Sequence, residues 1–169
     1  QVLWKVELPY AFPQIMVGGP VPGSRLGVGI SYSTYTDRDF FTVSRGTASP
    51  RGEPVNYIDS LVSLGGVNDM RLAVSYRRTS RLLFGGGLHF LTGSNRLMGA
   101  REWEDPSYLA VSERAELAYF GLGFSAGFLM QPMSGLAIAG SIRKDGPLEV
   151  QLDSTEAIAT TIDMPLTLS

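Results

Sequence analysis

The chain contains no cysteine and a single histidine, His89, among its 169 residues. The absence of cysteine excludes disulfide scaffolds and thiolate-ligated metal sites. One histidine cannot supply the His clusters that hold most catalytic metals. The sequence therefore predicts no metal site and no cofactor.

Charged residues and long apolar runs are also scarce. Charged residues make up 18% of the chain, against about 25% in ordinary soluble domains. The net charge of −2 offers no basic face for nucleic acid, so nucleic acid is not an expected partner. The longest nearly apolar run, residues 117–130, has 14 residues and is shorter than the ~20 of a membrane-spanning helix.

What the sequence does contain is alternation of bulky and small residues with period 2. In residues 25–36 the bulky side chains fall on one face and glycine or serine on the other. The same pattern recurs in residues 70–79, 116–130 and 136–143. Because successive side chains of a strand point to opposite faces, this period predicts β-strands and excludes amphipathic helices.

The connections between these strands fall into two length classes. Turn-forming residues predict tight hairpins at 36–39, 79–81 and 131–135. Long polar connections are expected at 46–69, 93–114 and 144–161. Within the first, residues 56–64 have helical spacing, and we expect a loop with one helical turn or a strand extension. The pattern predicts about eight strands, with short turns on one side and long loops on the other.

The composition of the two strand faces indicates where the bulky residues point. One face carries Phe, Leu and Ile, and the other mainly Gly, Ala and Ser with occasional Arg. A soluble barrel instead meets water with a face of Lys, Glu, Asp and Thr. Bulky residues outside and small or polar residues inside are typical of a transmembrane β-barrel. Tyr32, Tyr35, Tyr76 and Phe90 lie near strand ends, where aromatic girdles form.

We therefore expect an all-β chain that forms an antiparallel transmembrane β-barrel in the outer membrane of a Gram-negative bacterium. Residues 1–169 are expected to form a single segment of an incomplete, monomeric barrel, in contact with outer-membrane lipid and lipopolysaccharide. A soluble barrel with the bulky face inside is the alternative.

Two stretches of the sequence resemble a known family. Residues 72–76 (LAVSY), a turn, then residues 83–94 (LFGGGLHFLTGS) are similar to outer-membrane transporters of long-chain fatty acids and other hydrocarbons. The ending 162–169 (IDMPLTLS) resembles the start of another strand of that family.

The resemblance implies a 14-stranded barrel with an N-terminal plug that imports hydrophobic small molecules. On that basis the chain is an internal fragment; a complete eight-stranded barrel is the alternative. Two other functions stay open: a soluble lipid-binding β-barrel, and an outer-membrane barrel with a structural or surface-interaction role.

Candidate ligand-binding residues lie on the small-residue face of the strands. Arg71, Arg77, His89 and Arg143 are expected to face the lumen, where they would contact a ligand, a plug or structural carboxylates. Arginine suits a fatty-acid carboxylate because its planar fork donates two hydrogen bonds. Gly85, Gly86 and Gly87 are candidates for a strand irregularity that opens a lateral exit.

Catalytic residues are not expected, and we predict no enzymatic activity. Residues 123–127 (GFSAG) match the G-x-S-x-G nucleophile elbow, but they lie inside a period-2 run instead of a strand-to-helix turn. The order His89, Asp105, Ser125 imitates a catalytic triad, yet Asp105 belongs to the acidic loop 102–106. That loop is a candidate for divalent cations bridging lipopolysaccharide, or a solvated loop with Trp103 packed locally.

Overall fold

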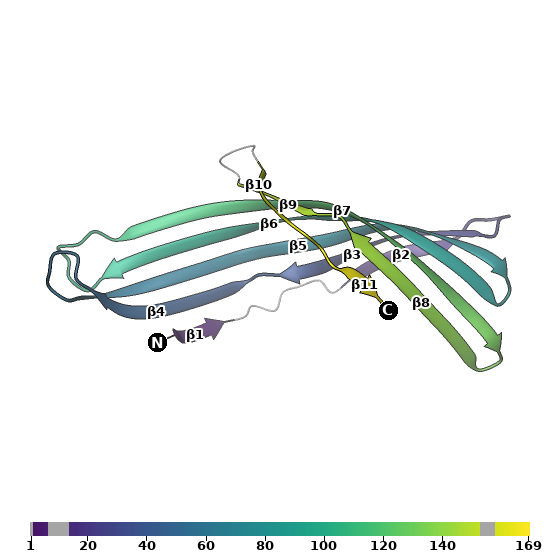
Figure 1. Ribbon diagram of the computed structural model, residues 1–169, viewed down its shortest axis with the longest axis horizontal. Helices are drawn as coiled ribbons and strands as arrows, with labels where there is room; N and C mark the ends of the chain where they lie inside the picture. Colours follow the sequence, from purple (N-terminus) through teal and green to yellow (C-terminus); the bar gives the residue numbers. More distant parts are fainter. Residues whose placement is uncertain (1, 7–13, 153–157) are drawn as a thin grey trace.

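The computed structural model describes residues 2–6, 14–152 and 158–169, and this part of the chain is all-β. Eleven strands pair antiparallel in one sheet (Figure 1). They are β1 (Val2–Val6), β2 (Gln14–Pro20), β3 (Leu26–Asp37), β4 (Phe40–Ala48), β5 (Val55–Thr79), β6 (Leu82–Trp103), β7 (Val111–Met133), β8 (Leu136–Asp145), β9 (Leu148–Leu152), β10 (Ile158–Ile162) and β11 (Leu166–Leu168). Among the described residues, no helix is long and apolar enough to cross a membrane.

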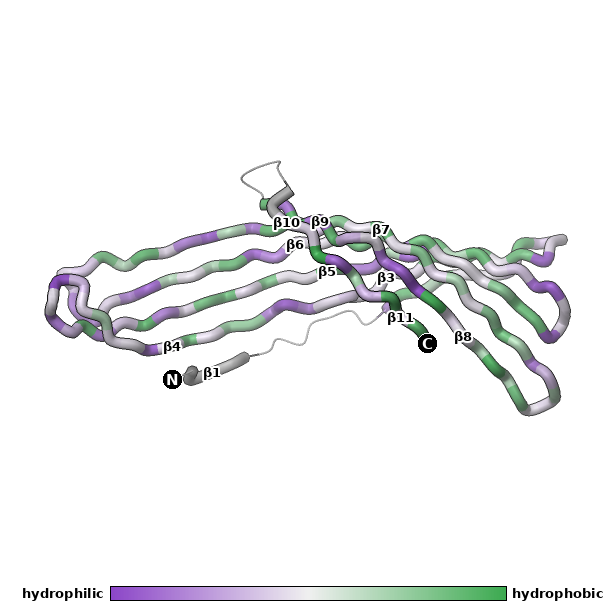
Figure 2. The backbone as a smooth tube through the Cα atoms, in the orientation of Figure 1, coloured by the Kyte–Doolittle hydropathy of each residue, from purple (hydrophilic) through white to green (hydrophobic). Residues whose placement is uncertain are grey.

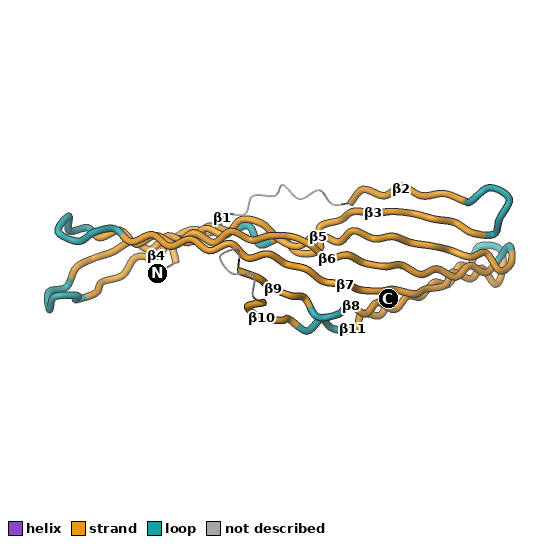
Figure 3. The backbone as a smooth tube through the Cα atoms, turned by 90° about the horizontal axis from the view of Figure 1, so that it is seen from above, coloured by secondary structure: helices purple, strands orange, loops and turns teal. Residues whose placement is uncertain are grey.

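Three long neighbouring strands, β5, β6 and β7, run the length of the sheet. They have 25, 22 and 23 residues, and the other strands flank them (Figure 3). On one side, β3 and β4 both pair with β5, and β2 and β1 continue outward from them. On the other side, β8 and β9 both pair with β7, followed by β11 and β10. The sheet is open, since no described strand pair joins its two outer edges.

The hairpin predicted at residues 36–39 is wrong. β3 and β4 lie end to end along β5, so the chain continues in one direction through Arg38 and Asp39. The backbone N–H of Arg38 donates to the Gly65 carbonyl at 2.9 Å, and the Asp39 carboxylate accepts from the Gly65 N–H. These polar residues therefore bond to the neighbouring strand instead of closing a turn.

The long loops predicted at 46–69 and 93–114 are also wrong, because most of their residues are strand. The connections shrink to residues 49–54 and 104–110. Residues 56–64 belong to β5, which confirms the strand extension that was one of the two expectations for this segment. The backbone groups of these residues hydrogen-bond to the neighbouring strands in unbroken register. Such backbone pairing can form a strand without alternating apolar side chains. In the third predicted loop, β9 and β10 occupy part of 144–161, and residues 153–157 lie outside the described residues. The predicted tight turns at 79–81 and 131–135 are confirmed at β5–β6 and β7–β8.

Bulky side chains cover one face of the sheet near these tight turns, and we call this the bulky face. They are exposed: Phe124 is 61% and Val28 is 55% accessible. Figure 2 shows the hydrophobic stretches of β7 and β8 at this end of the sheet. The bulky face comprises Ile15, Val17, Leu26, Val28, Ile30, Tyr32, Met70, Leu72, Val74, Tyr76, Phe84, Leu88, Phe120, Leu122, Phe124, Phe128, Met130, Ile138, Ile142, Leu166 and Leu168.

The opposite face, which we call the small-residue face, holds the one buried apolar cluster of the described residues. Its members are Val67, Leu91, Tyr119, Leu148 and Val150. They come from β5, β6, β7 and β9, in the middle of the long strands. Val67 and Leu91 lie two residues from Asp69 on β5 and from His89 on β6, so the apolar cluster is next to these polar residues along the strands.

Candidate functional site

A chain of hydrogen bonds crosses the small-residue face over β5, β6 and β7. The His89 Nδ1 lies 2.9 Å and 3.0 Å from the two carboxylate oxygens of Asp69. The His89 Nε2 lies 2.9 Å from the Oγ of Ser125. Because a carboxylate only accepts, Nδ1 carries the proton in the neutral imidazole and Nε2 accepts from the Ser125 hydroxyl.

Strand register brings these three side chains together. Arg71 stands directly opposite His89, and Gly87 stands directly opposite Ser125. All odd-numbered residues here point to the small-residue face, so Asp69 and Ser125 lie diagonally adjacent to His89 on either side. Diagonal neighbours on antiparallel strands are within reach of long side chains.

An arginine and a second carboxylate complete the polar cluster. The Arg143 Nη1 lies 2.7 Å from Asp69 Oδ2, and its Nε lies 2.8 Å from Asp145 Oδ2. The guanidinium also stacks 5.1 Å from the centre of the Tyr35 ring. Tyr35 therefore contributes to this cluster instead of to an aromatic girdle.

The cluster is deeply buried. His89 is fully inaccessible, and Asp69 and Asp145 are each 3% exposed. Removing carboxylates from water is costly unless they are paired, and each of these is paired with Arg143. Glycine at position 123 makes room, because a methyl group there would collide with the Asp145 carboxylate.

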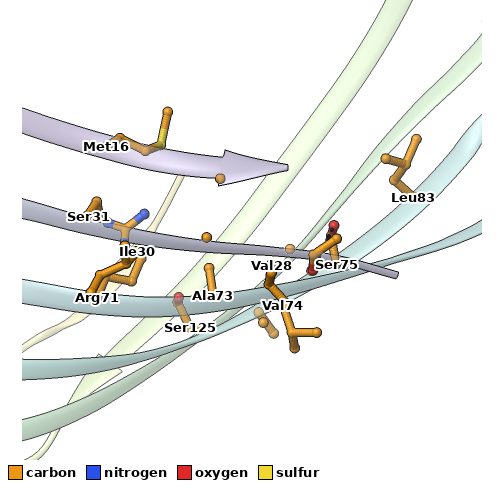
Figure 4. A pocket seen from close by; sticks show the side chains of 18 of the residues that line it. Met16, Val28, Ile30, Ser31, Arg71, Ala73, Val74, Ser75, Leu83 and Ser125 are labelled. Carbon is orange, nitrogen blue, oxygen red and sulfur yellow. Dashed lines mark hydrogen bonds between the residues drawn. The ribbon is translucent and has the colours of Figure 1, made fainter. Parts of the chain in front are cut away.

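A hollow of about 1000 Å³ opens on this face, between β2 and β11 and over the central strands. Figure 4 shows Arg71, Ala73, Ser75 and Ser125 among its lining residues. Within the described part of the chain, two buried guanidinium nitrogens have no hydrogen-bond partner: Arg71 Nε and Arg143 Nη2. Both arginine side chains are partly exposed and line the hollow, so it offers guanidinium groups to an anionic or carbonyl oxygen.

The structure places all four candidate polar residues around this hollow: Arg71, Arg77, His89 and Arg143. Gly85, Gly86 and Gly87 line it as well. These glycines keep an unbroken register with both neighbouring strands, so the irregularity expected there is not present. The register shift between β5 and β6 falls instead between Arg77 and Thr79, next to the tight turn.

Sequence reasoning missed the two carboxylates of the site, Asp69 and Asp145, and the contact between His89 and Ser125. Residues 123–127 do lie inside β7, so no nucleophile elbow exists. Asp105 stands in the 104–110 connection, where its carboxylate accepts the Ser107 N–H at 2.8 Å. This bond lowers the pKa of Asp105. The carboxylate that meets His89 is supplied by β5, and only the pairing register reveals it.

The far end of the long strands carries a separate surface cluster. The Arg101 guanidinium donates two hydrogen bonds of 2.7 Å to the Asp59 carboxylate and lies 4.1 Å from the Tyr57 ring centre. The hydrogen bonds from Arg101 lower the pKa of Asp59. Trp103 packs edge-on against Tyr57 at 5.6 Å, so it packs locally. No group of three or more metal-ligating side chains occurs in the ranges that the structure covers.

Comparison with known proteins returns no matching family model, curated protein or solved structure.

Proposed function

We propose that the chain forms part of an outer-membrane β-barrel that imports hydrophobic small molecules such as long-chain fatty acids. The observation that carries this proposal is the exposure of the bulky face across seven strands, opposite a face of small and polar residues. Single exposed apolar residues are normal on a soluble protein, but a contiguous apolar patch of this width marks an interaction or membrane surface.

The length of the bulky face fits a bilayer. On β7 it runs from Phe120 to Met130. At ~3.4 Å per residue this segment is about 34 Å long, and a 45° tilt reduces its height to about 24 Å. The lipid-facing band of outer-membrane barrels is ≈ 25 Å tall. Tyr32 and Tyr76 stand at opposite ends of this band on β3 and β5, where interfacial aromatic residues are expected.

The two ends of the sheet differ in the way that this class of barrel requires. Tight turns close β5–β6 and β7–β8 at the end nearest the bulky face. At the other end β4, β5, β6 and β7 extend well beyond it before they turn. Outer-membrane barrels have short periplasmic turns and longer extracellular parts. We therefore assign the long extensions to the extracellular side.

The hollow provides the route for a ligand. An anionic head group is complementary to the guanidinium groups of Arg71 and Arg143, which line the hollow. The glycines that line the hollow leave space for an aliphatic chain beside them. A long-chain fatty acid combines both features, a carboxylate and an apolar tail.

Uptake of labelled oleate by cells tests the proposal. Cells lacking the gene are complemented with the wild-type protein or with Arg71→Gln. Loss of a charged hydrogen bond of about 1.5–3 kcal/mol predicts a roughly 10- to 150-fold weaker apparent affinity for the variant. Arg78→Gln is the matched control, because Arg78 is exposed at the end of the same strand.

Two results would contradict the proposal and identify the alternatives. Recovery of the protein in buffer without detergent would indicate a soluble lipid-binding barrel. Outer-membrane fractionation with oleate uptake equal in deleted and complemented cells would indicate a structural or surface-interaction role.

A further inference from the structure

We propose that Asp69, His89 and Ser125 form a catalytic triad that hydrolyses carboxylic esters in the hollow. This activity is distinct from import and does not depend on it. The sequence predicted no enzymatic activity. The pairing of β5, β6 and β7 leads to a different proposal, because it brings these three side chains within hydrogen-bond distance.

The three side chains satisfy the distances that the chemistry needs. Ser125 Oγ and His89 Nε2 are 2.9 Å apart, and His89 Nδ1 is 2.9 Å from the nearer Asp69 oxygen. A nucleophile, a base and a carboxylate that orients the base within hydrogen-bond reach define a triad by geometry, whatever the fold. His89 and Asp69 are buried, while Ser125 is partly exposed and lines the hollow. The reactive hydroxyl is therefore the member that a substrate can reach.

Glycines surround Ser125 on this face. Gly87 stands opposite it on β6, and Gly123 and Gly127 precede and follow it on β7. A methyl group on Gly87 would lie only 3.0 Å from Ser125 Oγ. Gly87 keeps the space beside the hydroxyl free of a side chain, so an acyl carbon can approach there, whereas the Asp145 carboxylate fills the space beside Gly123.

The Arg71 guanidinium can supply a hydrogen-bond donor beside the Ser125 hydroxyl. The methyl position on Gly87 that lies 3.0 Å from Ser125 Oγ also lies 3.4 Å from Arg71 Cδ. The Arg71 side chain is partly exposed and lines the hollow. An N–H placed beside the attacked carbonyl stabilises the oxyanion that develops on it.

The reaction proceeds in two balanced steps. Ser125 Oγ bonds to the ester carbonyl carbon while its proton passes to His89 Nε2, and the oxyanion forms beside Arg71. The carbon–alkoxide bond then breaks, and the departing oxygen takes the proton from His89. Water attacks the acyl-enzyme, gives its proton to His89, and releases the carboxylic acid as Ser125 regains its hydrogen. Asp69 holds the imidazole and stabilises its charged form throughout.

The hollow favours an ester of an aliphatic acid. Apart from its arginines and the polar cluster, it is lined mainly by glycine, serine and apolar side chains such as Met16 and Leu83. An acyl chain can lie against these residues with its carbonyl at Ser125.

A covalent probe and a simple ester test the proposal on the full-length protein in detergent. A fluorophosphonate should label the wild-type protein on the peptide that carries Ser125, as read by mass spectrometry. The wild type should hydrolyse p-nitrophenyl butyrate at least about 100-fold faster than Ser125→Ala, the scale of a positioned acid–base group. Ser112→Ala, an exposed serine on the same strand, should keep both the label and the rate.

The labelling experiment uses the wild-type protein, so it does not depend on whether a variant folds. Absence of label on Ser125 in the folded wild type overturns the proposal. Hydrolysis by a folded Ser125→Ala at the wild-type rate overturns it as well, since the hydrogen-bonded chain is then purely structural. Neither outcome alters the uptake result for oleate, so the two proposals fail separately.

Discussion

Replacing Val74 with arginine measures directly what the bulky face contacts. Val74 lies in the middle of this face on the central strand β5 and is 51% exposed. If the face meets hydrocarbon, arginine near the bilayer midplane destabilises the folded state by ≈ 2–4 kcal/mol. That range corresponds to a roughly 30- to 700-fold loss in the ratio of folded to unfolded protein. In water the same exposed substitution changes stability by only about ±0.5 kcal/mol.

Leu64→Arg on the same strand is the matched control. Leu64 is 39% exposed and lies ten residues from Val74, toward the long extensions. That separation is about 34 Å along the strand, which carries it outside a hydrocarbon band of ≈ 25 Å. We expect its cost to stay below about 1 kcal/mol.

Equilibrium urea unfolding in phosphocholine vesicles, followed by tryptophan fluorescence, compares the two variants with the wild type. The expected result is a gap of at least about 1 kcal/mol between Val74→Arg and Leu64→Arg. Equal free energies of unfolding for the two variants, each within about 0.5 kcal/mol of wild type, would refute the membrane placement of the bulky face.

Two further predictions concern the polar cluster and the surface cluster. Gly123→Ala should destabilise the protein strongly, because the new methyl group would collide with the Asp145 carboxylate. Gly85→Ala should have a mild effect, because no atom lies closer than 3.6 Å to the position of its methyl group. Unfolding curves compare the two variants, and equal unfolding midpoints would contradict this packing. The Asp59 pKa is lowered in the folded state, so its contribution to stability is complete above the unfolded pKa and is lost as pH falls through the folded pKa. Arg101→Gln should weaken this acid dependence, as measured by unfolding between pH 7 and pH 3, and an unchanged pH profile would exclude the pair as its source.

The sequence predicted the all-β class and the two faces because alternation is a local property. Phe124 and Ser125 point to opposite faces in any strand, whatever that strand pairs with. The ends of the long strands were mispredicted in segments where bulky and small residues do not alternate. Residues 56–64 were ambiguous because Ile58, Leu61 and Val62 have helical spacing, yet their backbone pairs with β4 and β6 on both sides.

Whether the chain turns back after β3 or continues in the same direction into β4 cannot be predicted from the local sequence. Residues 36–39 have the composition of a hairpin, but Asp39 bonds to Gly65 of the neighbouring strand, and the chain runs straight on. The side chain of a turn-forming residue can hydrogen-bond to any backbone group within reach. The sequence does not show whether that group belongs to its own turn or to another strand. Because β3 and β4 share β5 as partner, the bulky residues of β3 lie beside those of β5.

The hydrogen bonds of His89 could not be predicted from the sequence either. Period 2 places Asp69, His89 and Ser125 on one face, but many odd-numbered residues share that face. Only the register that sets Arg71 opposite His89 and Gly87 opposite Ser125 turns a shared face into a hydrogen-bonded chain. A shift of one residue in either pairing would send the partner strand's side chains to the other face and break the chain. Register, more than residue type, therefore decides whether these three side chains form a hydrogen-bonded chain.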